Sequence, residues 1–232
     1  MFMCGPAFWQ QFDEGGGGGP DPGFYIYEGA TDAGGEVILG AAVIAQASFL
    51  NAVSPTITAE DFESYADNDI LNSETFTHNG VDCTFGGDVL LAISITAQSG
   101  TTLGRFNTTS GGSQYADGII MSQDYPLEFN FSTPVSAFGL YITDLGDFGV
   151  GANTQVRLTK SAASGGGTST YTVTTSSANS NGWLHFWGFT DGTDTYDKVE
   201  LLRDVSSVDD PDVLTDAIGI DDVFFAPASY LV

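Results

Sequence analysis

Basic residues are scarce in this chain. Five of its 232 residues are Lys or Arg, against thirty Asp or Glu, which gives a formal net charge of −25. Such a charge repels the phosphates of nucleic acids, so we expect no binding of DNA or RNA. It also disfavours anionic lipid surfaces. The acidity fits a solvated surface or, for some of the carboxylates, the binding of a cation such as Ca²⁺.

Cysteines and long apolar runs are also few. The two cysteines, Cys4 and Cys83, indicate neither a disulfide framework nor a zinc site. The most apolar stretch, residues 36–50, is interrupted by Gly40 and Gln46 and is shorter than the roughly 20 residues that a membrane span needs. The first residues show no signal peptide and the last ones no anchor. We therefore expect no membrane partner.

Motifs of catalysis are missing as well. The sequence contains no nucleophile elbow, no P-loop, no H-E-x-x-H motif and no zinc-ligand spacing. Of the two histidines, His185 lies in a predicted strand, where the pattern favours a structural role over that of a catalytic base. We predict that the protein is not an enzyme.

Alternation of apolar and polar residues dominates from residue 56 onward. Phe129 and Phe131 alternate with polar residues, and so do Val156 and Leu158. A period of two is typical of strands with one buried face. Turn signals such as Asn79-Gly80 separate the strands at short intervals. The pattern predicts an all-β protein in which residues 56–232 form a jelly-roll-like antiparallel β-sandwich.

The predicted strands share this alternation and are bounded by turn residues. They cover Thr56–Glu63, Phe76–Thr84, Val89–Thr96, Gly118–Met121, Leu127–Phe131, Ala137–Asp144, Thr154–Lys160, Thr168–Thr175, Gly182–Thr190, Lys198–Arg203 and Ala217–Ala226.

Residues 1–55 have a different character. Aromatic residues come first, and the five glycines of Gly15–Gly19 then form a flexible tether. A strand is predicted around Phe24–Tyr27, and residues 36–50 read as a second strand or a short helix. We interpret residues 1–55 as an extended N-terminal arm that docks on its own domain or on another subunit. The expected interface residues are apolar or aromatic: Phe2, Phe8, Trp9, Phe12, Phe24, Tyr25 and Tyr27.

Four stretches carry a family resemblance. They are GRFNTT at 104–109, FNFSTPVSAFGLYITDLGDFG at 129–149, WLHFWGFTD at 183–191 and AIGIDDVFF at 217–225. In this order they resemble the jelly-roll domains of exported bacterial proteins of the PEP-CTERM type. The resemblance implies a non-catalytic module, related in shape to carbohydrate-binding jelly rolls. Those proteins have a signal peptide and a sorting anchor, neither of which is visible here.

Several acidic residues are candidate Ca²⁺ ligands, because Ca²⁺ prefers hard oxygen donors. Jelly rolls of the implied kind often bind an ion where the first and last strands meet, which points to Glu63, Asp221 and Asp222. Asp144 and Asp147 form a second compact acidic turn. For this turn, hydrogen bonds from the side chains to local amides are the competing interpretation.

Two functional hypotheses follow. The tethered arm, the acidity and the lack of catalytic motifs favour a bacteriophage capsid cement or decoration protein on the outer surface of the virion. Its expected partners are the major capsid protein, other virion proteins and further copies of itself, with a trimer expected from this role. The alternative is an extracellular carbohydrate-binding module or a tail-associated glycan-binding protein. Trp183, Trp187 and Tyr196 would then stack on sugar rings, although the pattern favours a place for these aromatic residues in the core or in a subunit interface.

Overall fold

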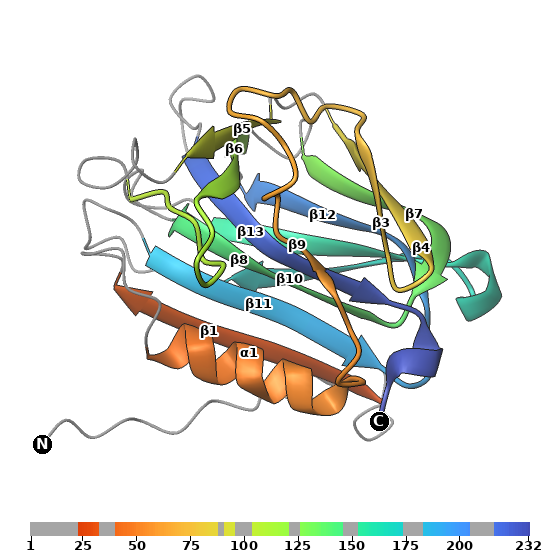
Figure 1. The fold of residues 1–232 in the computed structure, drawn as a ribbon. Coiled ribbons are helices and arrows are strands. Elements are labelled where there is room, and N and C mark those ends of the chain that lie inside the picture. Colours follow the sequence, from red (N-terminus) through yellow and green to blue (C-terminus); the bar gives the residue numbers. More distant parts are fainter. Residues whose placement is uncertain are drawn as a thin grey trace, which may run out of the picture.

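The chain folds into two antiparallel β-sheets packed face to face, with a helix on the outside of the larger sheet (Figure 1). This computed structural model describes residues 23–32, 40–87, 91–95, 104–120, 126–145, 153–173, 183–204 and 216–232. The predicted jelly-roll-like β-sandwich is confirmed. None of the described helices is long and apolar enough to cross a membrane.

The larger sheet has seven strands and is buried most deeply at its centre. Its hydrogen-bonded order is β1-β11-β8-β13-β6-β5, and β2 pairs with β13 from outside this path. The strands are β1 (Phe24–Asp32), β2 (Ala59–Glu60), β5 (Leu91–Ile95), β6 (Gln114–Ile120), β8 (Ala137–Leu145), β11 (Trp183–Asp191) and β13 (Asp216–Ala226).

The smaller sheet has six strands in the order β10-β9-β12-β7-β4-β3. These are β3 (Thr75–His78), β4 (Val81–Gly86), β7 (Leu127–Val135), β9 (Asn153–Lys160), β10 (Thr168–Val173) and β12 (Tyr196–Asp204). Two short 3₁₀ turns, η1 (Ala162–Ser164) and η3 (Ala228–Tyr230), complete the described elements.

Aromatic side chains fill the space between the sheets. Phe129 of β7 lies between Phe85 and Phe138, with ring centroids 5.3 Å and 5.1 Å away. All three side chains are at most 2% exposed. Phe129 alternates along its strand with half-buried Glu128 and Asn130, as the sequence pattern predicts. The inner face of each sheet is therefore mostly apolar, which is the main source of stability in such a fold.

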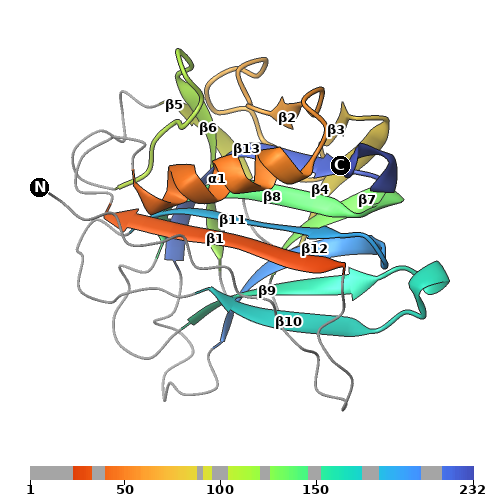
Figure 2. The same cartoon turned by 90° about the horizontal axis from the view of Figure 1, so that it is seen from below.

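The helix α1 (Ala41–Ala52) covers part of the outer face of the larger sheet (Figure 2). It begins after Gly40, which has φ 73°, and its Ala42, Ala45 and Phe49 are buried against the sheet. A side chain at Gly29 of β1 would collide with the backbone of Ala41, so glycine allows the close approach of strand and helix. For residues 36–50 the sequence allowed either a strand or a short helix. The structure has a helix, which begins within this stretch at Ala41.

The predicted boundary at residue 55 is wrong for the described residues, because β1 and α1 belong to the sandwich. β1 pairs with β11 over nine residues, from Phe24 with Asp191 to Asp32 with Trp183. Phe24 and Tyr27 are therefore buried in their own domain rather than in an intermolecular interface, while Tyr25 is 40% exposed. The predicted interface residues Phe2, Phe8, Trp9 and Phe12 lie outside the described residues.

Two predicted strands differ in detail. The stretch Thr56–Glu63 contributes only the two-residue strand β2, because Phe62 adopts φ 58° and the chain turns away from β13. The stretch Phe76–Thr84 is a hairpin of β3 and β4 around Asn79-Gly80, both with positive φ. This is the turn that an Asn-Gly pair favours.

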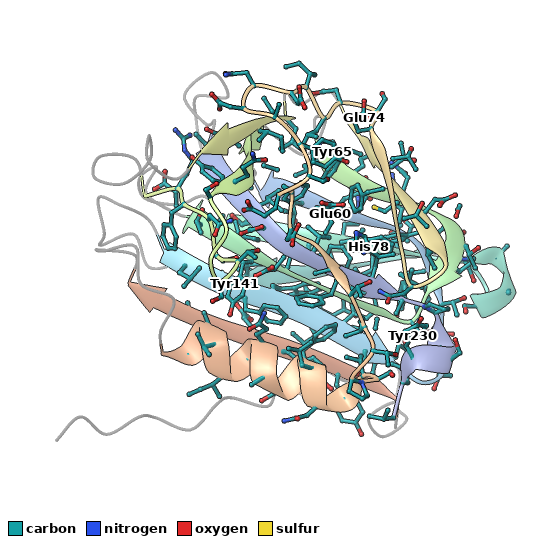
Figure 3. The ribbon with its side chains drawn as sticks, in the orientation of Figure 1. Glu60, Tyr65, Glu74, His78, Tyr141 and Tyr230 are labelled. Carbon is teal, nitrogen blue, oxygen red and sulfur yellow. The ribbon has the colours of Figure 1, made fainter. Side chains whose placement is uncertain are left out.

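The Asn79 side chain fastens residues 58–60 to the sandwich. Its Nδ2 donates to the carbonyl oxygens of Thr58 and Phe225, each at 2.9 Å, and its Oδ1 accepts from the Thr58 backbone N–H at 3.0 Å. Beside it, His78 Nε2 lies 3.2 Å from Glu60 Oε2 (Figure 3) and His78 Nδ1 lies 3.1 Å from Thr58 Oγ1. These contacts hold the strand β2 in place, although β2 itself has only two residues.

We expect Asn79→Gly to lower the free energy of unfolding by about 2 kcal/mol, because glycine keeps the positive φ and removes only the side-chain hydrogen bonds. The matched control is Asn68→Gly. Asn68 also has a positive φ, but its side chain is exposed and reaches only the neighbouring Asp67. Urea denaturation of both variants measures the difference, and equal losses would contradict the role of the Asn79 side chain.

Candidate functional site

Asp221 of β13 holds the loop that precedes β6. Its Oδ2 accepts hydrogen bonds from the backbone N–H of Thr108 at 2.6 Å, from Thr108 Oγ1 at 3.0 Å and from the N–H of Thr109 at 3.1 Å. The Asp221 side chain is fully buried. A buried carboxylate needs donors, and in a chain with so few cations the loop backbone provides them.

Asp222 points to the same loop as Asp221. Neighbouring residues of a regular strand would face opposite sides. Asp222 instead has φ 48°, and the register of β13 against β8 shifts between Asp221 and Phe224. This bulge lets the Asp222 oxygens accept from Thr109 Oγ1 at 2.8 Å and from Thr108 Oγ1 at 3.1 Å.

Glu63 binds the other end of the loop. Its Oε1 accepts from the backbone N–H groups of Ser113 at 2.6 Å and Gln114 at 2.8 Å, and from Asn107 Nδ2 at 2.8 Å. Three predicted metal ligands, Glu63, Asp221 and Asp222, thus meet around one loop, residues 104–113. We call this arrangement the acid clamp.

The acid clamp brings negative charges together, and one of its carboxylates, that of Asp221, is fully buried. Burial, and the neighbouring carboxylate of Asp222, raise the pKa of Asp221 well above its usual range. Burial also raises the pKa of Asp222. The hydrogen bonds from Thr109 and Thr108 lower this pKa, whereas the negative charges of Asp61 and Glu63 raise it further. The loop donors therefore offset only part of the cost of bringing these carboxylates together.

The oxygens that bind the loop are occupied by N–H and O–H donors, an arrangement that fits a loop anchor better than a set of Ca²⁺ ligands. Among the described residues, no group of three or more His, Cys, Asp or Glu side chains could hold a metal ion. Asp144 lies on β8, three residues beyond Tyr141, the partner of Asp221, and hence about 10 Å along the strand. Asp147 lies outside the described residues. Ca²⁺ binding stays a prediction.

We expect Asp221→Ala to lower the free energy of unfolding by about 3 kcal/mol, because the buried N–H groups of Thr108 and Thr109 lose their acceptor. Asp67→Ala is the control, since Asp67 is exposed and bonds only the next side chain; it should change the value by less than about 0.5 kcal/mol. Chemical denaturation at pH 7 compares the two, and a small effect of Asp221→Ala would show that the clamp does not stabilise the fold.

His185 of β11 is fully buried between the sheets, and neither ring nitrogen has a hydrogen-bond partner. Burial lowers its pKa to about 4. The ring is therefore neutral at pH 7 and out of reach of any substrate. This agrees with the structural role that the alternation of β11 favours.

The lowered pKa predicts a pH dependence of stability. The unfolded chain binds the His185 proton below about pH 6.5 and the folded chain only below about pH 4, so this residue costs stability as the pH falls between the two values. Replacing it by leucine should remove that cost. The stability of His185→Leu relative to wild type should rise by about 3 kcal/mol from pH 7 to pH 4.

Comparing the variant with wild type at each pH cancels the contributions of Asp221 and Asp222. Their raised pKa values act in the opposite sense, because stability from them is lost as the pH rises. Urea unfolding at several pH values gives the measurement. A difference that does not change with pH would mean that the folded protein protonates His185 as readily as the unfolded chain does, which would contradict the lowered pKa.

The predicted stacking platform is wrong for two of its three residues. Trp187 and Tyr196 are at most 1% exposed and pack in the inter-sheet core, where the rings of Tyr196 and Phe189 lie 4.9 Å apart. The Tyr196 hydroxyl donates to Asp191 Oδ2 at 2.8 Å, so its polar atom is satisfied inside the protein. Trp183 belongs to β11, and its side chain lies outside the described set.

The outer face of the smaller sheet carries polar side chains on adjacent strands. We call it the polar face. Its main members lie on the side of each strand that faces away from the inter-sheet core: Thr168, Thr170 and Thr172 of β10, Gln155, Arg157 and Thr159 of β9, Lys198 and Glu200 of β12, Glu128 and Asn130 of β7, and Thr84 of β4. Among the described elements, α1 packs on the other sheet and leaves this face uncovered.

A hydrogen-bonded chain of charges runs across the polar face. Arg157 donates through Nε and Nη2 to both oxygens of Glu200, at 2.8 Å and 2.7 Å. Lys198 Nζ joins Glu200 Oε1 at 2.9 Å to Glu128 Oε1 at 3.0 Å. Although burial alone would raise it, these donors lower the pKa of Glu200 below its ordinary value. The side chains thus hold one another in place.

Where it lies on β7, β9, β10 and β12, the polar face is electrically balanced in a very acidic protein. Four of the five basic residues of the chain, Arg157, Lys160, Lys198 and Arg203, lie on the adjacent strands β9 and β12. On these strands of the face, Arg157 and Lys198 stand against Glu128 and Glu200, while the exposed Asp82 lies on the same face at β4. We did not predict this surface, although the clustering of basic residues in two predicted strands was a visible signal.

No family model and no curated protein matches the chain. A solved structure of the CBM22-1–GH10 modules of the Clostridium thermocellum endo-1,4-β-D-xylanase 10B, complexed with xylohexaose, aligns with 75% of this chain and 29% of that chain at 10% identity, with a TM-score of 0.42. The CBM22-1 xylan-binding domain of Paenibacillus barcinonensis Xyn10C aligns over 73% and 98%, at 12% identity and a TM-score of 0.35.

The enzymatically active domain of tailspike protein 4 of Bacteriophage CBA120 aligns over 75% of this chain and 22% of that chain, at 10% identity and a TM-score of 0.36. The chain therefore spans less than a third of the xylanase and tailspike chains with which it aligns.

Proposed function

We propose that the protein is a non-enzymatic glycan-binding module and that the polar face of the smaller sheet is its binding surface. The observation that carries the proposal is the fixed chain of donors and acceptors from Arg157 through Glu200 and Lys198 to Glu128. Sugar hydroxyls both donate and accept hydrogen bonds, so a surface that alternates the two kinds of group matches them.

The electrostatics select the kind of glycan. The balanced face lies within a protein of net charge −25, which repels acidic polysaccharides and nucleic acids. A neutral polysaccharide meets no such barrier. The exposed threonines of β10 and the amides of Gln155 and Asn130 supply further groups that bond hydroxyls without adding charge.

Among the described side chains, the face has no ring of the predicted stacking platform, since Trp187 and Tyr196 are buried in the core. Binding would therefore depend on hydrogen bonds at a wet interface, each with a net value of about 1 kcal/mol. This implies weak binding to a single sugar and stronger binding to a long chain that lies across several strands.

A panel of neutral and acidic polysaccharides tests the proposal by affinity electrophoresis. We expect retardation by a neutral polysaccharide, and the double variant Asn130→Ala with Gln155→Ala should weaken it by roughly tenfold, since about 1.4 kcal/mol corresponds to that factor. The two amides are chosen because both are half-buried at the surface and their loss leaves the Arg157–Glu200 pair intact.

Asn51→Ala is the control, because Asn51 is an exposed amide on α1, on the other sheet. It should bind as wild type does. Wild-type protein that no neutral polysaccharide retards would contradict the proposal, and so would an equal loss in the control.

The role in a virion, with a capsid protein or further copies of the chain as partners, stays a prediction. The same holds for the trimer and for an outer-capsid or extracellular location.

A further inference from the structure

The outer side of α1 and the neighbouring part of β1 form an uncharged surface. We call it the α1 surface and define it by Tyr25, Val43, Ile44, Ala47 and Leu50. Ile44 is 38% exposed and Tyr25 40% exposed, while Ala47 is exposed and the other two are half-buried. α1 has no charged residue at all, which is unusual for the solvent side of a helix in so acidic a protein.

Tyr25 belongs to this surface because of the alternation of β1. Phe24 and Ile26 point into the inter-sheet core, whereas Tyr27 packs on Phe49 of α1 with ring centroids 5.7 Å apart. Tyr25 therefore projects to the helix side of the sheet. Since Gly29 meets Ala41 and Tyr27 meets Phe49, strand and helix run in opposite directions, and Tyr25 lies beyond the Phe49 end of α1.

We propose that residues 1–12 of the same chain bind the α1 surface. This segment, MFMCGPAFWQQF, includes four aromatic residues and no charged side chain. It is joined to β1 through residues 13–22, and β1 begins at the end of α1 where Leu50 lies. The tether therefore enters the fold beside the surface that the segment would cover.

The length of the connection, residues 13–22, fits the length of the helix. A flexible linker of ten residues has a root-mean-square span of about 17 Å, and a helix of 12 residues is about 18 Å long. A short linker whose mean span matches the distance gives an effective concentration in the millimolar range. Weak apolar contacts are then enough to keep the segment bound.

A second copy of the folded domain fits this surface less well. The outward side of a 12-residue helix measures only about 18 Å by 10 Å, whereas a stable dimer buries roughly 800 Å² on each partner. Two domains that each carry a charge of −25 also repel one another. An uncharged segment of the chain itself covers the surface without this repulsion.

The fluorescence of Trp9 in the full-length protein tests the proposal. The chain has three tryptophans, so the signal of Trp9 is obtained as the difference between the spectra of wild type and Trp9→Phe. We expect a blue-shifted emission that is protected from acrylamide. Ile44→Glu and, separately, Ala47→Glu should shift the emission to that of an exposed tryptophan. Both sites are exposed helix positions where glutamate is a good helix former, so folding is preserved.

Thr133→Glu, at an exposed position of β7 in the smaller sheet, is the control and should leave the emission of Trp9 unchanged. Emission typical of an exposed tryptophan in wild type would overturn the proposal, and so would a blue shift that survives both α1 variants. Protection that appears only at concentrations where the protein sediments as a dimer would overturn the assignment to the same chain. Glycan binding by the polar face is a separate measurement, so either proposal can fail alone.

Discussion

The seven-stranded sheet must be covered on both faces, and most of the structure follows from this constraint. All nine residues of β8 are buried, and so are the described side chains of β11 from Leu184 to Asp191. The smaller sheet covers one face with aromatic side chains. On the other face, α1 covers β1 and β11, and the loop at 104–113 covers part of β13. Both faces must be covered because a sheet with two apolar faces is not stable in water. Each covering element must in turn be attached to the sheet.

The two outer covers are attached by different physical means. The helix packs through small and aromatic residues, Ala42, Ala45 and Phe49, against glycines that permit close approach. The loop at 104–113 has a single buried apolar side chain, that of Phe106. It is held by carboxylates that accept hydrogen bonds from its N–H groups. In a chain with five basic residues, backbone amides thus take the place that lysine or arginine has in other acidic clusters. The basic residues are concentrated instead on β9 and β12, where they balance the polar face.

Much of the fold could be predicted from the period of two in the apolar residues. Strands β7, β8, β9, β11 and β13 lie close to where alternation placed them, because their inner side chains are apolar in any register that buries one face. The short strand β2 was overestimated, since the chain turns at Phe62. The predicted boundary at residue 55 failed because a glycine-rich tether resembles a domain linker, whereas the strand that follows it completes the edge of the sheet.

The sequence by itself determined the fold class, the absence of recognised catalytic motifs and the acidic character, because composition and local periodicity suffice for these. Only the tertiary structure decided what single residues do. Trp187 and Tyr196 are core residues because their side chains lie between the two packed sheets. Asp221 and Asp222 contact the same loop because a β-bulge interrupts the alternation of β13. The polar face depends on the pairing of β9 with β12 and of β12 with β7, which brings together Arg157, Glu200 and Glu128 from distant parts of the chain. Local patterns cannot specify such pairings, since many strand orders bury the same apolar residues.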